Sequence, residues 1–102
     1  MKTKTIFEEL NICFDNIERG INVDGNATMF AVCLSDVCNS FKHCYIFEFE
    51  RWELLVVQQW IYKLLGNKDI SNKTRARISI YNTVLCDMLE ELNGVKEFND
   101  TL

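Results

Sequence analysis

The chain has 102 residues, a formal net charge of −4, no proline and four glycines. This length is enough for one domain with a core of its own, and we expect a single helical domain over residues 1–102. The scarcity of turn-forming residues argues against an all-β fold. The excess of acidic side chains disfavours non-specific binding to nucleic acid and favours a basic partner.

No segment of the sequence indicates secretion or insertion into a membrane. Glu8 and Glu9 interrupt the segment in which a secretory signal would need an apolar run. Glu53 and Lys63 are among the polar residues that divide the longest apolar stretch into pieces too short to span a bilayer. The five cysteines fit no disulfide framework, which favours free thiols in a reducing compartment. We therefore expect a cytoplasmic protein.

The first predicted helix lies between Thr5 and Gly20. Thr5 and Glu8 have the spacing of a capping box, in which two side chains bind amides of the first turn. Gly20 stands where a left-handed residue commonly ends a helix. The apolar residues of this segment repeat at intervals of three and four, as one face of a helix requires. They are Ile6, Phe7, Leu10, Cys13, Phe14 and Ile17.

The second segment has two interpretations. Asp24-Gly25 predicts a turn, after which Asn26 caps a helix over about residues 27–40. Its apolar face is then Phe30, Cys33, Leu34, Val37, Cys38 and Phe41. The alternative is an α+β fold with a hairpin that pairs residues 27–34 with residues 43–50, where apolar and polar residues also alternate. We prefer the helix, because the connecting segment lacks the glycine that hairpin loops favour.

Residues 44–66 are the most apolar part of the chain and contain both tryptophans. One stripe at helical spacing is formed by Tyr45, Phe49, Trp52, Val56, Trp60 and Leu64. The stripe is widened to about half of the circumference by Leu54, Val57, Ile61 and Leu65. A helix that is apolar on most of its circumference is normally buried. We therefore predict a helix that starts near residue 43 and forms the centre against which the other helices pack.

The last predicted helix begins after Ser71 or Asn72, either of which is a suitable N-cap. Gly94 is expected to end it, with a frayed tail over residues 95–102. Its apolar residues are Ile78, Tyr81, Val84, Leu85, Met88, Leu89 and Leu92. The four helices with short links predict an all-α fold, either a small bundle or an orthogonal array.

The residues that could support chemistry are few, and we expect neither a metal, a cofactor nor an enzyme. Cys33, Cys38, His43 and Cys44 lie close in sequence, but the spacing exceeds that of a zinc knuckle. The single histidine has no glycine-rich elbow or oxyanion loop to accompany it. Buried structural thiols are the simpler interpretation.

A basic group lies where the last helix begins. Lys73, Arg75 and Arg77 follow a short polar connection between two apolar helices, which resembles the outline of a helix-turn-helix. A nucleic-acid-binding regulator that uses these three residues is our second hypothesis. The acidic balance of the chain argues against it.

The acidic residues lead to our first hypothesis. Asp87, Glu90 and Glu91 are predicted near the C-terminal end of the last helix, where they oppose the helix dipole, as the basic residues do at its beginning. A binding partner of opposite charge can offset the unfavourable energy of charges in these positions. Candidate partner-binding residues are Glu48, Glu50, Glu53, Asp87, Glu90 and Glu91.

A small acidic domain without catalytic residues suits a protein that neutralises a basic enzyme, since acidic surface speeds association with a basic cleft. An immunity protein or antitoxin against a nuclease toxin, or a virus-encoded inhibitor, is the kind of protein we expect. The third hypothesis is a self-associating structural subunit, because 48% of the residues are hydrophobic and an exposed apolar stripe can form a homodimer.

Overall fold

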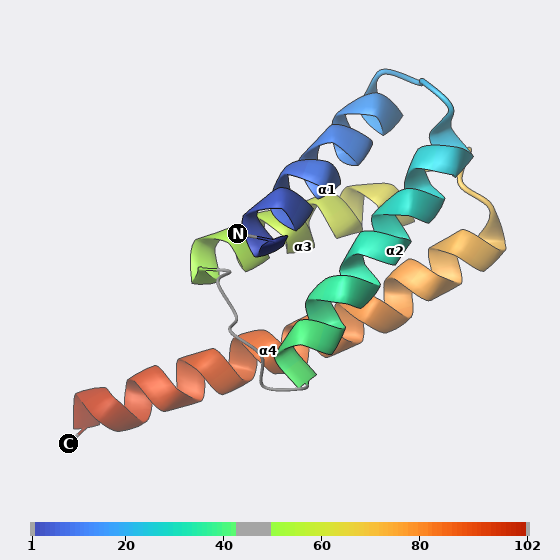
Figure 1. Ribbon diagram of the computed structural model, residues 1–102. Coiled ribbons are helices and arrows are strands. Elements are labelled where there is room, and N and C mark those ends of the chain that lie inside the picture. The colour runs from blue at the N-terminus through green and yellow to red at the C-terminus, as the bar shows by residue number, and fades with distance from the viewer. Residues whose placement is uncertain (1, 43–49, 102) are drawn as a thin grey trace.

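The computed structural model describes the backbone of residues 2–42 and 50–101, and the side chains of residues 6–39 and 50–91. These residues form four α-helices and no strand (Figure 1). The helices are α1 (Lys2–Glu18), α2 (Val23–Lys42), α3 (Arg51–Leu65) and α4 (Asn72–Thr101). The predicted all-α class is confirmed. The alternative hairpin is wrong, because residues 27–34 are helical; residues 43–49 of its second strand lie outside the described part.

The helices lie around a common core in the order α1, α2, α4, α3. Helix α2 packs along α1 on one side and along α4 on the other, whereas α3 packs along α4 and meets α1 only at one edge. Consecutive helices alternate in direction, so α1 and α2 form one antiparallel pair and α3 and α4 another (Figure 1). Helices α2 and α3 therefore occupy opposite corners of the bundle.

Helix α2 contacts its neighbours more extensively than any other described helix and α3 does so least, so the prediction that residues 44–66 form the centre is wrong for residues 50–66. Several of the residues that α2 buries are small, which allows neighbouring helices to approach it closely on two sides. The buried side chains of α2 are Ala27, Phe30, Ala31, Cys33, Leu34, Val37 and Cys38. Bulky Phe30 and Leu34 are fully buried in this core, and the Cys33 and Cys38 thiols lie against α1 and α4 respectively.

Helix α3 begins at Arg51, since Glu50 has an extended backbone, with φ −85° and ψ 158°. The prediction of one unbroken helix from near residue 43 through Glu50 is therefore wrong. Residues 43–49 lie outside the described part. Four residues of the predicted apolar face are buried in α3, namely Leu54, Val57, Ile61 and Leu64, and Glu53 is buried beside them. Trp52 is 54% exposed at the start of α3, whereas Trp60 is half-buried against the core.

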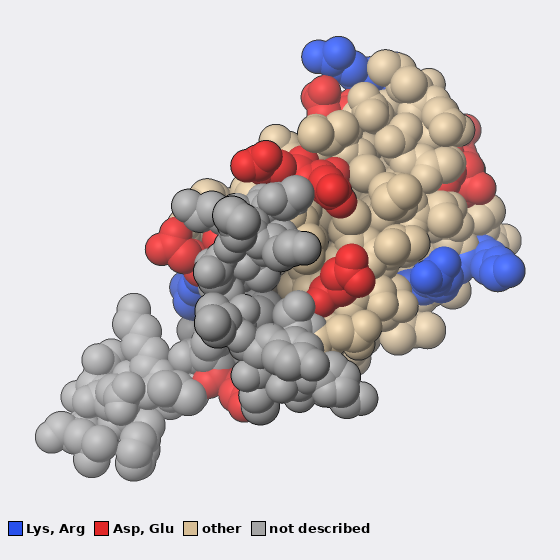
Figure 2. Space-filling model, viewed as in Figure 1, with Lys and Arg blue, Asp and Glu red and all other residues tan. Residues whose placement is uncertain are grey.

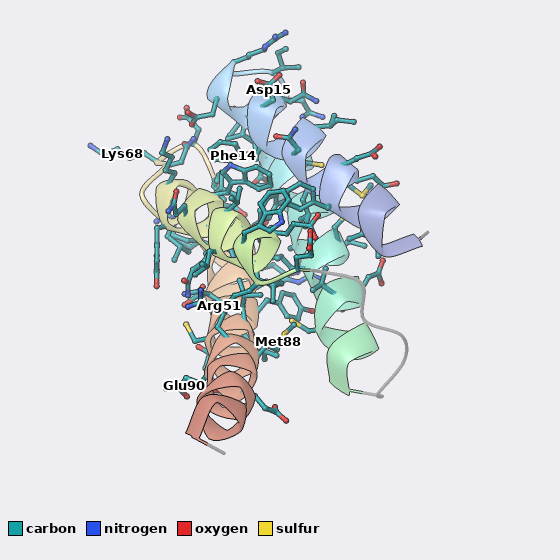
Figure 3. All side chains as sticks on the ribbon, turned by 90° about the vertical axis from the view of Figure 1, so that its left-hand side faces the viewer. Phe14, Asp15, Arg51, Lys68, Met88 and Glu90 are labelled. Carbon is teal, nitrogen blue, oxygen red and sulfur yellow. The ribbon has the colours of Figure 1, made fainter. Side chains whose placement is uncertain are left out.

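Aromatic side chains fill the space between α1 and α3, whose backbones come close only at one edge. The ring of Trp60 stacks on Phe14 at 5.3 Å and on Phe7 at 5.6 Å between centroids. Trp52 meets Phe7 edge-on at 5.9 Å. Figure 3 shows Phe14 between the two helices. Large rings span a gap that smaller apolar side chains would leave open.

Helix α1 ends at Glu18, and Gly20 is the left-handed residue predicted after it, with φ +75°. The N–H groups of Gly20 and Ile21 donate to the carbonyls of Ile17 and Asn16, at 3.0 and 2.9 Å, which is the hydrogen-bond pattern of a Schellman motif. The start of the helix differs from the prediction. Because α1 begins at Lys2, Thr5 is inside the helix and is not its N-cap.

Helix α2 begins at Val23, earlier than predicted. Asp24, Gly25 and Asn26 therefore belong to its first turn, and neither the Asp24-Gly25 turn nor the Asn26 cap exists. The side chains of Asp24 and Asn26 instead bind backbone groups of the connections between helices. Asp24 Oδ1 accepts the backbone N–H of Ser71 at 2.9 Å, and the Asn26 side chain donates to the carbonyl of Ile21 at 2.9 Å. These bonds hold the two tight connections at the same end of the bundle.

Helix α4 has the predicted N-cap, since Ser71 Oγ accepts the N–H of Thr74 at 3.3 Å. Its buried apolar residues Ile78, Leu85, Met88 and Leu89 belong to the predicted face. The prediction that Gly94 ends the helix is wrong, because α4 continues to Thr101. The fraying of residues 95–102 stays a prediction.

The left-handed backbone at Gly20 gives the first testable prediction. We expect Gly20→Ala to lower the free energy of unfolding by about 1–2 kcal/mol, because a Cβ is strained at positive φ even though no atom lies within 4 Å of it. Urea denaturation measures the change. Gly66→Ala is the matched control, because the Gly66 backbone is right-handed, with φ −90°, and stability should stay constant or rise by up to about 1 kcal/mol. Equal losses in both variants would contradict the prediction.

Candidate functional site

The six acidic residues predicted to bind a partner do not lie on one surface. Glu53 is only 7% exposed, and its Oε1 accepts the N–H of Glu50 at 2.8 Å in a capping box, so Glu53 serves the start of α3 rather than a partner. Glu50 is exposed, and its Oε2 accepts the indole N–H of Trp52 at 2.9 Å. Glu48 lies outside the described residues.

Asp87, Glu90 and Glu91 are exposed on α4. No ion pair joins any of the three to another side chain in the described part of the chain. Figure 3 shows Glu90 on the side of α4 that faces away from α2. The dipole argument for these residues is wrong, since α4 continues to Thr101 and the three carboxylates lie near its middle. They remain together as an exposed acidic surface, which we call the α4 acidic surface.

The predicted basic residues do not form one free surface. The Arg75 guanidinium donates to the carbonyls of Asn67 and Ile70, at 2.8 and 3.0 Å, and so closes the connection between α3 and α4. Arg77 is half-buried beside Tyr81, where hydrogen bonds from Ser35 and then from Arg77 lower the pKa of the Tyr81 hydroxyl. Lys73 is exposed. The basic charges at the start of α4 thus include one that binds carbonyl groups of the fold itself.

The cysteines of α2 face different neighbours and do not converge. The Cys33 thiol donates to Glu9 Oε2 of α1 at 3.5 Å, whereas the Cys38 thiol points to the carbonyl of Tyr81 in α4 at 4.0 Å. Burial raises the pKa of Cys38 to about 11, and burial together with Glu9 raises the pKa of Cys33 to about 12. Both thiols are therefore protonated near neutral pH, in the form that is poor as a nucleophile or metal ligand. His43 and Cys44 lie outside the described residues.

A groove between α1 and α2 was not predicted. It has a volume of about 270 Å³ and is lined by Glu9, Ile12, Cys13 and Met29. Ile12 is 59% exposed and Met29 51% exposed. Val32, one turn after Met29 on the outer side of α2, is 41% exposed. Together they place apolar surface on the outside of the bundle.

Carboxylates accompany this apolar surface, and we call the two together the α1–α2 groove. Glu8, Glu9 and Asp36 are exposed on α1 and α2. Coulombic effects of Glu9 and Asp36 contribute to the raised pKa of Cys33, which indicates that both lie near the same thiol. Figure 2 views this face of the bundle and shows acidic atoms across it, with basic atoms at its margins.

The sequence did contain a signal for the groove. Ile12, Met29 and Val32 are apolar residues that do not belong to the predicted core faces of their helices. Apolar residues outside the core face of a helix are common on protein surfaces. Only the antiparallel packing of α1 on α2 brings these three together.

No protein-family model, curated protein or solved structure matches this chain. Of the helices in the described residues, none has the length and apolar content needed to cross a membrane. The described residues also contain no group of three or more histidine, cysteine, aspartate or glutamate side chains placed to hold a metal ion. Any account of function therefore depends on the surfaces described above.

The hydrogen bonds of Arg75 give a testable prediction. We expect Arg75→Ala to lower the free energy of unfolding by about 2 kcal/mol, because it leaves the carbonyls of Asn67 and Ile70 without their charged donor. Urea denaturation of Lys73→Ala provides the control, since Lys73 is exposed and its loss should change stability by less than about 0.5 kcal/mol. If the two variants are equally stable, the assignment of Arg75 to the fold is wrong.

The raised pKa of Cys33 predicts how stability depends on pH. From its ordinary value of 9.0 up to about 12, the unfolded chain loses the thiol proton while the folded chain keeps it. The unfolded state then binds fewer protons, so stability falls as pH rises through this range. We expect the loss to be smaller in Cys33→Ala by about 1–2 kcal/mol at pH 10.5. Urea titrations of both proteins from pH 8 to pH 10.5 measure the difference; parallel curves would refute the raised pKa.

Proposed function

We propose that this chain is a small acidic protein-binding domain that neutralises a partner with a basic functional surface, most simply a nuclease toxin. The observation that carries the proposal is the α4 acidic surface of Asp87, Glu90 and Glu91, exposed and without an ion pair to any described side chain. Carboxylates that neither cap a helix nor pair with a described side chain suit contact with a basic partner. Their field increases the rate at which such a partner associates.

The start of α3 adds a second feature that suits a protein interface. Trp52 is exposed, rests edge-on against Phe7 and donates its indole N–H to Glu50. Tryptophan is frequent among the residues that contribute most to protein–protein affinity, because it offers a large apolar area with little conformational entropy to lose. Contacts with Glu50 and Phe7 hold Trp52 in place before a partner arrives, which reduces the cost of binding.

A protein that acts only by covering its partner needs no reactive side chain, and several candidate reactive groups of this chain are buried or engaged in the fold. The thiols of Cys33 and Cys38 are protonated and buried, and Glu53 is engaged by the backbone of α3. A neutralising protein needs no reactive group of its own. It covers the basic cleft with which a nuclease holds phosphates and thereby excludes the substrate.

Association kinetics test this proposal. The chain carrying an affinity tag is used at low salt to isolate a stoichiometric partner, whose own activity is then measured with one equivalent of the chain. We expect the activity to fall. We also expect the double variant Glu90→Lys/Glu91→Lys to lower the association rate constant about tenfold and to weaken its dependence on salt, because the steering field is reversed.

Glu18→Lys/Asp69→Lys is the control, since it changes the net charge equally at exposed residues outside the α4 acidic surface. If the control slows association as much as the double variant, overall charge rather than this surface is responsible. Retention of nucleic acid in place of a protein, with loss of that retention in Lys73→Ala/Arg77→Ala, would contradict the proposal and favour a regulator of the helix-turn-helix kind.

A further inference from the structure

We propose that the α1–α2 groove receives an amphipathic helix of the partner, with apolar side chains along one stripe and lysine or arginine on either side of it. This inference rests on the proposed function and names the segment of the basic partner that the chain recognises. It concerns a face different from the α4 acidic surface, and the two can therefore be tested separately.

The apolar part of the groove has the spacing that a helix requires. Met29 and Val32 are three residues apart on α2, about 4.5 Å along its axis, and Ile12 lies across the groove on α1. A bound helix offers apolar side chains at the same interval of three or four residues. Methionine adapts its shape to such side chains because its thioether stem is unbranched and flexible.

The charge around the groove determines the partner's chemistry. Residues 6–39 include six carboxylates: Glu8, Glu9, Asp15, Glu18, Asp24 and Asp36. The one basic side chain among these residues is Arg19, which pairs with Asp15 at 3.2 Å. Glu9 lines the groove from α1, and Asp36 lies on α2 near the same Cys33 thiol. Basic residues on both sides of an apolar stripe would meet these carboxylates.

Two other occupants fit less well. A second copy of the chain would place Glu8, Glu9 and Asp36 of one molecule against the same residues of the other, and like charges at an interface oppose association. A small molecule usually occupies an enclosed pocket of about 300–1,000 Å³. The groove has about 270 Å³ and is bordered by exposed Ile12 and Met29, so it suits side chains of a larger partner.

A model peptide tests the inference without the natural partner. The probe is a fluorescently labelled 14-residue helix of leucine and lysine, and the comparison peptide has glutamate in place of each lysine. Fluorescence anisotropy measures the dissociation constant at low and at physiological salt. We expect the lysine peptide to bind and the glutamate peptide not to bind. Nuclear magnetic resonance of the unaltered chain should show the largest shift changes at the methyl groups of Ile12, Met29 and Val32.

Variants then separate the groove from the rest of the surface. We expect Ile12→Ser/Met29→Ser to weaken binding of the lysine peptide by about tenfold or more, since both side chains are exposed apolar contacts. Ile80→Ser is the matched control, because Ile80 is 63% exposed on α4, and binding should stay constant. Glu9→Gln/Asp36→Asn should weaken binding and reduce its salt dependence, whereas Glu90→Gln/Glu91→Gln should change neither.

Three results would overturn the inference. The lysine and glutamate peptides could bind equally well, or the groove and α4 variants could change the dissociation constant of the lysine peptide equally. The third is a dimer of the free chain that Ile12→Ser/Met29→Ser dissociates. The natural partner distinguishes this failure from that of the proposed function. If Glu90→Lys/Glu91→Lys slows its association while Ile12→Ser/Met29→Ser leaves its affinity constant, the proposed function stands and the groove is not the site. If the chain neutralises no partner, the proposed function is wrong; if it neutralises one and neither variant changes their association, neither the α4 acidic surface nor the groove is the binding site.

Discussion

The packing of α2 between α1 and α4 is the constraint on which the rest of the structure depends. Ala27, Ala31, Cys33 and Cys38 are small enough for both neighbours to approach, while Phe30 fills the space that remains at the centre. Because α2 occupies this position, α3 is placed at the opposite corner, against α4 and the edge of α1. The aromatic contacts of Trp60 with Phe7 and Phe14 follow from that arrangement, since only large rings reach between two helices that do not pack closely.

The same packing produces the surfaces that distinguish this protein from a plain helical bundle. Where α1 lies antiparallel to α2, the side chains of Ile12 and Met29 meet outside the core and form an apolar groove beside Glu9. The α4 acidic surface lies elsewhere, on a helix whose outer side no other described helix covers. The chain therefore presents carboxylates on more than one face, and one of these faces combines them with exposed apolar surface. Such a combination suits recognition of a basic amphipathic segment better than general solubility alone.

Several charged residues that look functional in the sequence belong instead to the connections. Arg75 supplies donors to two carbonyls between α3 and α4, and Glu53 holds the first turn of α3. Asp24 binds the amide of Ser71, so it joins the start of α2 to the start of α4. These side chains satisfy backbone groups at helix ends, which would otherwise be left without partners. Glu90 and Glu91 have no such partner among the described residues, which distinguishes them from the charged residues that serve the connections.

The sequence by itself determined the all-α class, the core faces of α1, α2 and α4 and the left-handed residue Gly20, and it limited the cap of α4 to Ser71 or Asn72. These features depend on helical periodicity and on side chains close in sequence, which act before the helices pack. Helix starts were less predictable: Asp24 binds the amide of Ser71 in another connection and Asn26 binds the carbonyl of Ile21 from within α2, and neither forms the turn or cap that its type favours. Only the tertiary structure decided that α2 is central, that Trp52 is exposed, and that Ile12 and Met29 share a groove. The physical reason is that burial of a side chain depends on which helices become neighbours. The spacing of apolar residues within one helix does not specify those neighbours.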